Sequence, residues 1–328
     1  MSALALQAIK RTYQKLRPLV RETPTIEWDG PVKRDLFGHR RVYIKMEFLQ
    51  HSGSFKIRGA FSVMLGHLDQ VRQKGVIAVS RGNHACAVSF AAKELGAKAK
   101  VVIPKSASAK RIEKAKSLGA RIFLTSDVDE AFALGKKIQK EEGCLFVHPY
   151  EGELTALGTA SLGLEFLDQA PPIGEGDVYV ACGGGGLLAG VSAYLKQKAP
   201  GCRIIGVEPE GAPTLSESLR EGKTLSLKKM ETIADSLAAP DALPFSFGLC
   251  REFVDEMMTV SDLQIVKAME AIFEDLTLVL EPAGVTALAG AMKTCSEKRP
   301  LGIILCGSNI ELGEYHKLQK AFPSKKRA

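Results

Sequence analysis

Short apolar segments of strand length alternate with helical segments along most of this 328-residue chain. Strict alternation of strand and helix is typical of parallel sheets that are covered by helices. The strand-like runs occupy residues 76–79, 99–104, 121–124, 177–181, 203–207 and 302–305. The sequence therefore predicts two open parallel α/β sheets, preceded by an N-terminal helix over about 4–20.

Composition indicates an ordinary globular protein. With 45% hydrophobic and 25% charged residues, the chain is average in composition, and its length allows roughly two domains. Its seven cysteines are scattered, odd in number and without a C-x-x-C pair, and no signal peptide precedes them. We therefore expect a reduced, cytoplasmic protein without a zinc site.

The net charge of +7 does not by itself indicate a nucleic-acid partner. Basic and acidic residues are interspersed almost everywhere, whereas nucleic-acid-binding chains gather basic residues on one arm or face. No apolar run approaches the roughly 18 residues that would indicate a membrane span. The sequence thus favours a small-molecule partner over nucleic acid or a membrane.

One lysine stands in an unusual setting, because Lys56 lies between Phe55 and Ile57 with glycines close on both sides. An amine in an apolar, glycine-lined corner loses hydration, so its pKa falls and it becomes nucleophilic towards an aldehyde. An alternating run at 41–47 predicts a strand that leads directly into this segment. The segment suits a lysine that forms a Schiff base, although taken alone it also fits a helix start with a surface lysine.

Four consecutive glycines, Gly183 to Gly186, follow the run 177–181 and precede a helical stretch. Backbone N–H groups in such a turn approach an anion closely at the start of a helix, which predicts a phosphate cradle. The segment from Gly184 to Ala189 also fits the dinucleotide fingerprint G-x-G-x-x-A, with Glu208 some twenty residues on. However, that alternative leaves the Lys56 segment unexplained, and four glycines suit a compact monophosphate at least as well.

A second loop with anion-binding character lies between the run 76–79 and the next helical stretch. It consists of Ser80, Arg81, Gly82, Asn83 and His84. Its N–H groups predict a site for a substrate carboxylate. A lone histidine such as His84 is more often structural, and we assign it no proton transfer.

These segments occur in the order and spacing of one enzyme family. The motifs are SFKIRGA, SRGNHA, GGGGLLAG, EPAG at 281–284 and CGSNI at 306–310. The chain resembles the beta family (fold type II) of pyridoxal phosphate enzymes, and within it the threonine/serine dehydratase and serine racemase group. This resemblance implies a large domain of residues 1–49 and 151–328, a small inserted domain of 50–150, and an active site in the cleft between them.

The resemblance also implies a role for each motif. Lys56 would hold pyridoxal phosphate, Phe55 would pack against its ring, and Asn83 would bind its phenolic oxygen. Cys306 would lie beside the pyridine nitrogen as a neutral thiol, although its position also suits a small core residue. The amides that would hold the phosphate belong to Gly183, Gly184, Gly185, Gly186 and Leu187. The residues that would bind the substrate are Ser80, Arg81, Gly82, Asn83 and His84.

Two features depart from the family pattern. Serine racemases have an acid/base serine in place of Arg81, and an arginine stays protonated, which counts against racemisation as the main activity. Arg81 either points into solvent or grips a carboxylate. Glu208, Ala212 and Thr214 match a cation-binding loop, in which Thr214 suits a monovalent ion such as potassium (K+) better than magnesium.

We therefore predict a pyridoxal phosphate-dependent ammonia-lyase that converts L-threonine or L-serine into 2-oxobutyrate or pyruvate and ammonia. Lys56 would hold the cofactor and then act as general base. The alternatives are a dehydratase of 3-hydroxyaspartate, with Arg81 receiving the second carboxylate, a serine racemase, and a catalytically idle cofactor-binding protein. A homodimer is common in the family.

Overall fold

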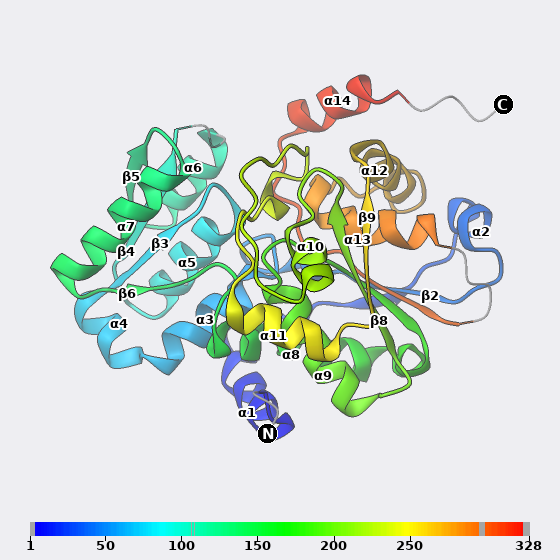
Figure 1. Cartoon of the computed structure of the whole chain (residues 1–328), viewed down its shortest axis with the longest axis horizontal. Coiled ribbons are helices and arrows are strands. Elements are labelled where there is room, and N and C mark those ends of the chain that lie inside the picture. Colours follow the sequence, from blue (N-terminus) through cyan, green and yellow to red (C-terminus); the bar gives the residue numbers. More distant parts are fainter. Residues whose placement is uncertain (1–3, 106, 108, 295–298, 324–328) are drawn as a thin grey trace.

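The computed structural model describes residues 4–105, 107, 109–294 and 299–323, and Cys295 lies outside this part. Its strands form two separate sheets, each covered by helices (Figure 1). The smaller sheet lies on the left of the view and the larger one on the right. Two α/β sheets were predicted, and this fold class is confirmed.

The larger sheet has the strand order β1-β2-β10-β7-β8-β9. β1 pairs antiparallel with β2 at one edge, and all other neighbours are parallel. Its strands are β1 (Thr25–Glu27), β2 (Val42–Lys45), β7 (Asp177–Ala181), β8 (Arg203–Pro209), β9 (Glu256–Val260) and β10 (Leu301–Ile304).

The smaller sheet is entirely parallel, with the order β5-β4-β3-β6. Its strands are β3 (Val76–Val79), β4 (Ala99–Pro104), β5 (Arg121–Thr125) and β6 (Leu145–Phe146). The chain leaves the larger sheet after β2, builds the smaller sheet, and returns to the larger one at β7. The domain boundaries at about 50 and 150 remain a prediction, since α3 also packs against α8 on the far side of the second boundary.

Helices connect most of the parallel strands, as right-handed crossover connections require. None of those in the described part of the chain is long and apolar enough to cross a membrane. They are α1 (Leu6–Leu16), α2 (Pro31–Phe37), α3 (Lys56–Gly66), α4 (Leu68–Lys74), α5 (Asn83–Glu94), α6 (Ala109–Ser117), α7 (Val128–Glu142), α8 (Glu153–Gln169), α9 (Gly186–Lys198), α10 (Thr214–Glu221), α11 (Pro244–Phe253), α12 (Asp262–Leu276), α13 (Pro282–Lys293) and α14 (Leu312–Ala321), with the short 3-10 turns η1 (Glu47–Leu49), η2 (Pro171–Glu175) and η3 (Asp235–Leu237).

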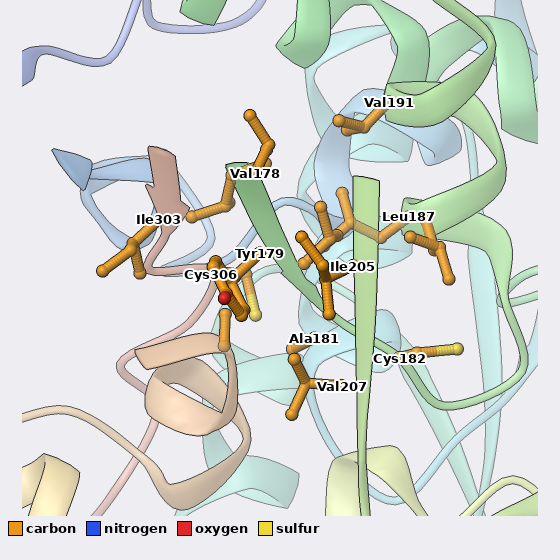
Figure 2. Close-up of a cluster of buried hydrophobic side chains, with 14 of the residues drawn as sticks. Val178, Tyr179, Ala181, Cys182, Leu187, Val191, Ile205, Val207, Ile303 and Cys306 are labelled. Carbon is orange, nitrogen blue, oxygen red and sulfur yellow. The ribbon is translucent and has the colours of Figure 1, made fainter. Parts of the chain in front are cut away.

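The main hydrophobic core surrounds the middle of the larger sheet. Every residue of β7 is buried, because α9 and α13 both pack against this strand. Figure 2 shows part of this core, to which Val178 of β7, Ile205 of β8 and Leu187 of α9 all contribute. Because both faces of these strands are buried, their sequences are continuous apolar runs.

The strand predicted at 41–47 needs a correction. β2 covers only Val42–Lys45, and η1 separates it from the Lys56 segment. All four of its residues are buried, so the strand does not alternate between a buried and an exposed face. Lys45 is buried because its ammonium donates to Glu165 at 2.9 Å, an ion pair that the sequence pattern did not reveal.

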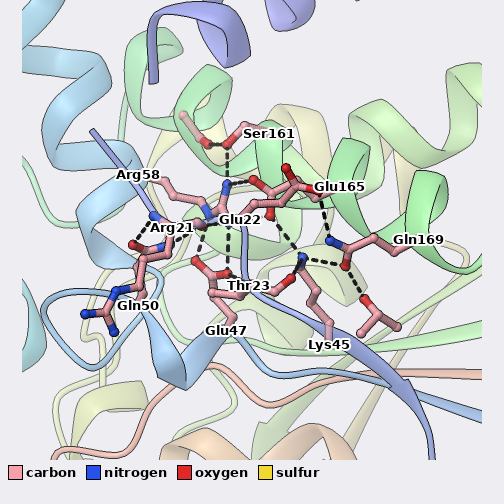
Figure 3. A network of polar contacts seen from close by, with 12 residues as sticks. Arg21, Glu22, Thr23, Lys45, Glu47, Gln50, Arg58, Ser161, Glu165 and Gln169 are labelled. Carbon is pink, nitrogen blue, oxygen red and sulfur yellow. Dashed lines mark hydrogen bonds and ion pairs between the residues drawn. The ribbon is translucent and has the colours of Figure 1, made fainter. Parts of the chain in front are cut away.

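Four buried charged side chains form the network that Figure 3 shows. Arg58 of α3 donates to Glu47 of η1 from Nε at 2.6 Å, and to Glu165 of α8 from Nη2 at 2.7 Å. Lys45 of β2 completes the set through Glu165. Two cations and two carboxylates balance in charge, and the network joins a strand, a 3-10 turn and two helices.

Replacing Arg58 with methionine should lower the free energy of unfolding by about 3–5 kcal/mol, because two carboxylates would remain buried without their main partner. Denaturant unfolding of the variant and the parent protein measures the effect. The control is Arg41→Met, which breaks an exposed ion pair with Glu27 and should lower the free energy of unfolding far less than Arg58→Met does. Equal losses in the two variants would show that the network does not hold the fold.

Candidate active site

A cavity of about 640 Å³ brings the three predicted loops together. The loops follow β2, β3 and β7, whose carboxyl ends face the same space, as ligand sites of open α/β sheets do. Every residue predicted to contact the cofactor or the substrate lines this cavity. Glu208, Ala212 and Thr214 do not line it.

Lys56 is the first residue of α3, and its side chain reaches the cavity. Its Nζ donates to the carbonyl of Pro149 at 2.7 Å and lies 4.9 Å from the centre of the Phe55 ring. Burial lowers the pKa of Lys56 from its ordinary 10.5 to about 8. A substantial fraction of the amine is therefore neutral, and nucleophilic, at mildly alkaline pH.

The rate at which the apo-protein forms a covalent adduct with pyridoxal phosphate should rise with pH, with a midpoint near 8. The reason is that only the neutral amine attacks an aldehyde, and a lowered pKa makes the amine neutral at lower pH. Stopped-flow absorbance over a pH series measures this rate. The Lys56→Ala variant provides the background from other amines, and a midpoint close to the ordinary lysine value would contradict the assignment.

The glycine loop joins β7 to α9 and is held against Tyr150. A Cβ on Gly184 would collide with the Tyr150 ring, and Gly185 has a φ of +87°, so neither position accepts another residue without strain. The N–H groups of Gly183, Gly184, Gly186 and Leu187 donate to no acceptor among the described residues. Such unpaired N–H groups at a helix start fit a phosphate.

Replacing Gly184 with alanine should weaken the binding of pyridoxal phosphate by roughly tenfold or more, about 1.4 kcal/mol, because the loop must move away from Tyr150. Absorbance titration of the apo-protein measures the affinity. The control is Gly248→Ala in α11, where an added Cβ meets nothing within 4 Å. If both variants bound the cofactor like the parent protein, the loop would not be the phosphate site.

The loop between β3 and α5 offers a second set of donors. The N–H of Gly82 donates to Ser80 Oγ at 3.1 Å. The N–H groups of Arg81, Asn83 and His84 have no acceptor in the described part of the chain. This donor set fits a carboxylate. Its assignment to the substrate remains a prediction.

His84 is buried beside this loop. Its Nε2 lies 2.8 Å from the carbonyl of Val147, and burial lowers the pKa of His84 to about 3. The imidazole is therefore neutral at ordinary pH, and Nε2 carries the hydrogen because a carbonyl only accepts. These contacts agree with the structural role that we expected for it.

Arg81 lies at the cavity without an acidic partner. Its guanidinium makes no hydrogen bond or ion pair with any described residue. A charged group in a partly enclosed site without a counter-ion favours an anionic ligand. Contact of Arg81 with a carboxylate remains a prediction.

Cys306 lies in the loop after β10, and its thiol is buried at the cavity wall. Its Sγ–H donates to the carbonyl of Ala283 at 3.5 Å. Burial raises the pKa of Cys306 to about 12, so the thiol stays neutral at ordinary pH. A neutral group is what we predicted beside the pyridine nitrogen.

Two residues that support the site belong to motifs that the sequence analysis quoted without assigning them a role. Glu281 lines the cavity and accepts a hydrogen bond from Asn83 at 2.7 Å. Asn309 donates to Asn83 from the other side at 2.6 Å. Their motifs were a signal in the sequence, but the contacts with Asn83 were not readable from it.

Two further residues of the cavity wall were missed altogether. Arg111 of α6 lines the cavity and pairs with Asp235 at 2.7 Å. In the sequence Arg111 looks like one more charge on a solvated helix, and no signal there distinguished it. Tyr150, which shapes the glycine loop, was missed because it stands in an irregular segment between two elements.

The predicted cation-binding loop lies near the start of α10. Glu208 is buried, its carboxylate accepts N–H groups of Leu215 and Ser216, and burial raises its pKa to about 7. Thr214 donates its hydroxyl hydrogen to the carbonyl of Ala239, which leaves its own lone pairs free for a cation. A monovalent cation at Glu208, Ala212 and Thr214 remains a prediction. No group of three or more His, Cys, Asp or Glu side chains suited to a metal occurs within the described ranges.

The chain is similar to known proteins over most of its length. The family described as "Pyridoxal-phosphate dependent enzyme" matches residues 16–307. The phenylserine dehydratase of Ralstonia pickettii is 42% identical over 315 residues, which are 94% of this chain and 94% of that protein. The L-threonine ammonia-lyase of Thermotoga maritima is 33% identical over 94% of this chain and 76% of its own. The structure of maize serine racemase superposes with a TM-score of 0.89 at 33% identity, covering 97% of this chain and 98% of that one.

Proposed function

Because this chain belongs to the pyridoxal-phosphate dependent enzymes, we propose that it is an ammonia-lyase that dehydrates a β-hydroxy amino acid, with L-threonine and L-serine as the first substrates to consider. The observation that carries the proposal is the Lys56 amine, whose pKa is lowered to about 8, in one cavity with two loops of unpaired N–H groups. One loop suits a phosphate and the other a carboxylate.

The residues of the cavity match the parts of the cofactor. Lys56 would hold its aldehyde carbon, and the amides of the glycine loop, Gly183 to Leu187, would hold its phosphate. Asn83 would donate to its phenolic oxygen, Phe55 would pack on its ring, and Cys306 would lie beside its pyridine nitrogen as a neutral thiol. When bound, pyridoxal phosphate supplies an electron sink for the negative charge that develops at the substrate's α carbon.

Lys56 then acts as the general base. Its lowered pKa would let the free amine take the α proton of the substrate near neutral pH. The β hydroxyl leaves as water, and the unsaturated product reacts with one water to give a 2-oxo acid and ammonia. Overall, L-threonine yields 2-oxobutyrate and L-serine yields pyruvate.

The cavity favours elimination over racemisation. Racemisation needs a proton carrier on each face of the α carbon. Arg81 stays protonated and cannot accept a proton, and the neutral His84 is held by the Val147 carbonyl. Lys56 is thus the one base that we assign.

A substrate with a larger apolar β substituent is a second candidate, and the name of the Ralstonia relative points the same way. Part of the cavity wall is apolar, beyond the residues assigned to the cofactor and the amino acid. The apolar residues of this part are Val79, Pro104, Val128, Phe132, Leu227 and Met230. Burying a phenyl group against such a wall is favourable by about 25 cal/mol per Å² of apolar surface.

The unpaired Arg81 favours a third substrate, 3-hydroxyaspartate, whose second carboxylate would pair with it.

Incubation of the holoenzyme with L-threonine, L-serine, 3-phenylserine and 3-hydroxyaspartate, followed by ammonia and 2-oxo acid assays, tests the function. We expect both products from L-threonine and L-serine, and none from the Lys56→Ala variant. An Arg81→Ser variant separates the roles of Arg81. If the KM of this variant rises for every substrate, Arg81 contacts the α carboxylate. If only the turnover of 3-hydroxyaspartate falls, Arg81 contacts the second carboxylate of that substrate. Full turnover without Lys56, or no ammonia from any of the four, would overturn the proposal.

A further inference from the structure

Glu281 is a buried carboxylate that the proposed reaction does not use. It precedes α13, is 1% exposed, and lines the cavity. A Cβ on Gly307 would collide with Glu281 Oε1, so the glycine after Cys306 makes room for this carboxylate. Burying a carboxylate is costly, which raises the question of what it does there.

The partners of Glu281 form a directed chain of hydrogen bonds. Lys114 Nζ donates to Asn309 Oδ1 at 2.6 Å, Asn309 Nδ2 donates to Asn83 Oδ1 at 2.6 Å, and Asn83 Nδ2 donates to Glu281 Oε1 at 2.7 Å. Arg111 Nη2 lies 3.5 Å from the other oxygen of Glu281. The chain links α6, the loop after β10, the start of α5 and the start of α13.

Each end of this hydrogen-bond chain can only donate or only accept. An ammonium group only donates. Burial raises the pKa of Glu281, whereas Arg111 and the hydrogen bond from Asn83 favour its ionised form, and an ionised carboxylate only accepts. Asn309 Nδ2 also donates to the carbonyl of Ser52 at 2.9 Å, which fixes the orientation of that amide independently. An asparagine amide on its own can flip, but between Asn309 and Glu281 the oxygen of Asn83 must face Asn309 and its nitrogen must face Glu281.

We propose that Glu281 is a positioning residue that orients the Asn83 amide so that it presents an N–H group to the bound cofactor. The Asn83 nitrogen carries two hydrogens, and Glu281 takes one of them. The second is left for an acceptor in the cavity that Asn83 lines. This inference rests on the proposed function, which places the cofactor's phenolic oxygen at Asn83.

The Glu281→Gln variant tests the proposal, since it keeps the shape but adds a donor. The new glutamine side chain must turn its NH₂ group either towards Asn83 or towards Arg111, and each choice places two donors face to face. The measurement is the affinity of the apo-protein for pyridoxal 5'-phosphate and for 3-deoxypyridoxal 5'-phosphate, which lacks the phenolic oxygen. Both probes keep the aldehyde and the phosphate.

We expect Glu281→Gln to weaken the binding of pyridoxal 5'-phosphate about tenfold, and that of the 3-deoxy compound by no more than about twofold. Asn83→Ala should give the same pattern, and adding Glu281→Gln to it should cause no further loss. Asn309→Asp, which puts an acceptor opposite Asn83 Oδ1, is a second route to the same result if Glu281→Gln does not fold.

Asp275→Asn is the control, because Asp275 accepts hydrogen bonds from Trp28, Val32 and Lys33 away from the cavity. It should leave both affinities unchanged even if it lowers the melting temperature. An equal loss for both probes in Glu281→Gln, or no loss for either, would overturn the positioning role. If the unmodified protein itself failed to bind pyridoxal 5'-phosphate, the proposed function would fail instead, so the two failures are distinguishable.

Discussion

The buried ion pairs of Arg58 with Glu47 and Glu165 are the interaction on which the site most depends. They join α3 to the turn just before it and to α8, whose Glu165 lies 107 residues from Arg58. Arg58 is two residues from Lys56, so the guanidinium turns into the protein while the amine turns into the cavity. Glycines allow α3 and α8 to approach closely, since a Cβ on Gly158 would collide with the Arg58 carbonyl.

Burial then decides which groups of the cavity carry charge. It lowers the pKa of Lys56 and His84 and raises the pKa of Cys306, and in each case the neutral form gains. Arg81 keeps its charge because a guanidinium does not lose its proton in a protein. Near neutral pH the cavity thus combines a basic amine and a fixed cation with two loops of backbone donors. This combination suits an amino acid substrate that must lose a proton from carbon.

Local patterns in the sequence predicted the parts of the fold that local forces determine. β3, β4 and β7 were predicted with their observed bounds, because strands buried on both faces appear as uninterrupted apolar runs. The glycine loop and the Ser80–His84 loop were placed correctly, since each follows such a strand. Lys45 was not recognised as buried, because its partner Glu165 lies 120 residues away.

The chain of hydrogen bonds through Asn83 was unpredictable for the same reason. Glu281 and Asn309 lie 198 and 226 residues from Asn83. Lys114 and Arg111 look like solvated charges of a helix until the two sheets are assembled. The residues proposed to bind the cofactor directly come in short motifs, whereas the residues proposed to orient them are spread over the chain.

The most direct test of the central claim is to locate the covalent bond. The holoenzyme is reduced with borohydride, digested, and sequenced by mass spectrometry, so that the reduced cofactor marks its lysine. We predict the label on the peptide that contains Lys56, and less of it in the Gly184→Ala variant, whose affinity for the cofactor is lower. A label on another lysine, or no label on the unmodified protein, would contradict the claim that Lys56 holds the cofactor in this cavity.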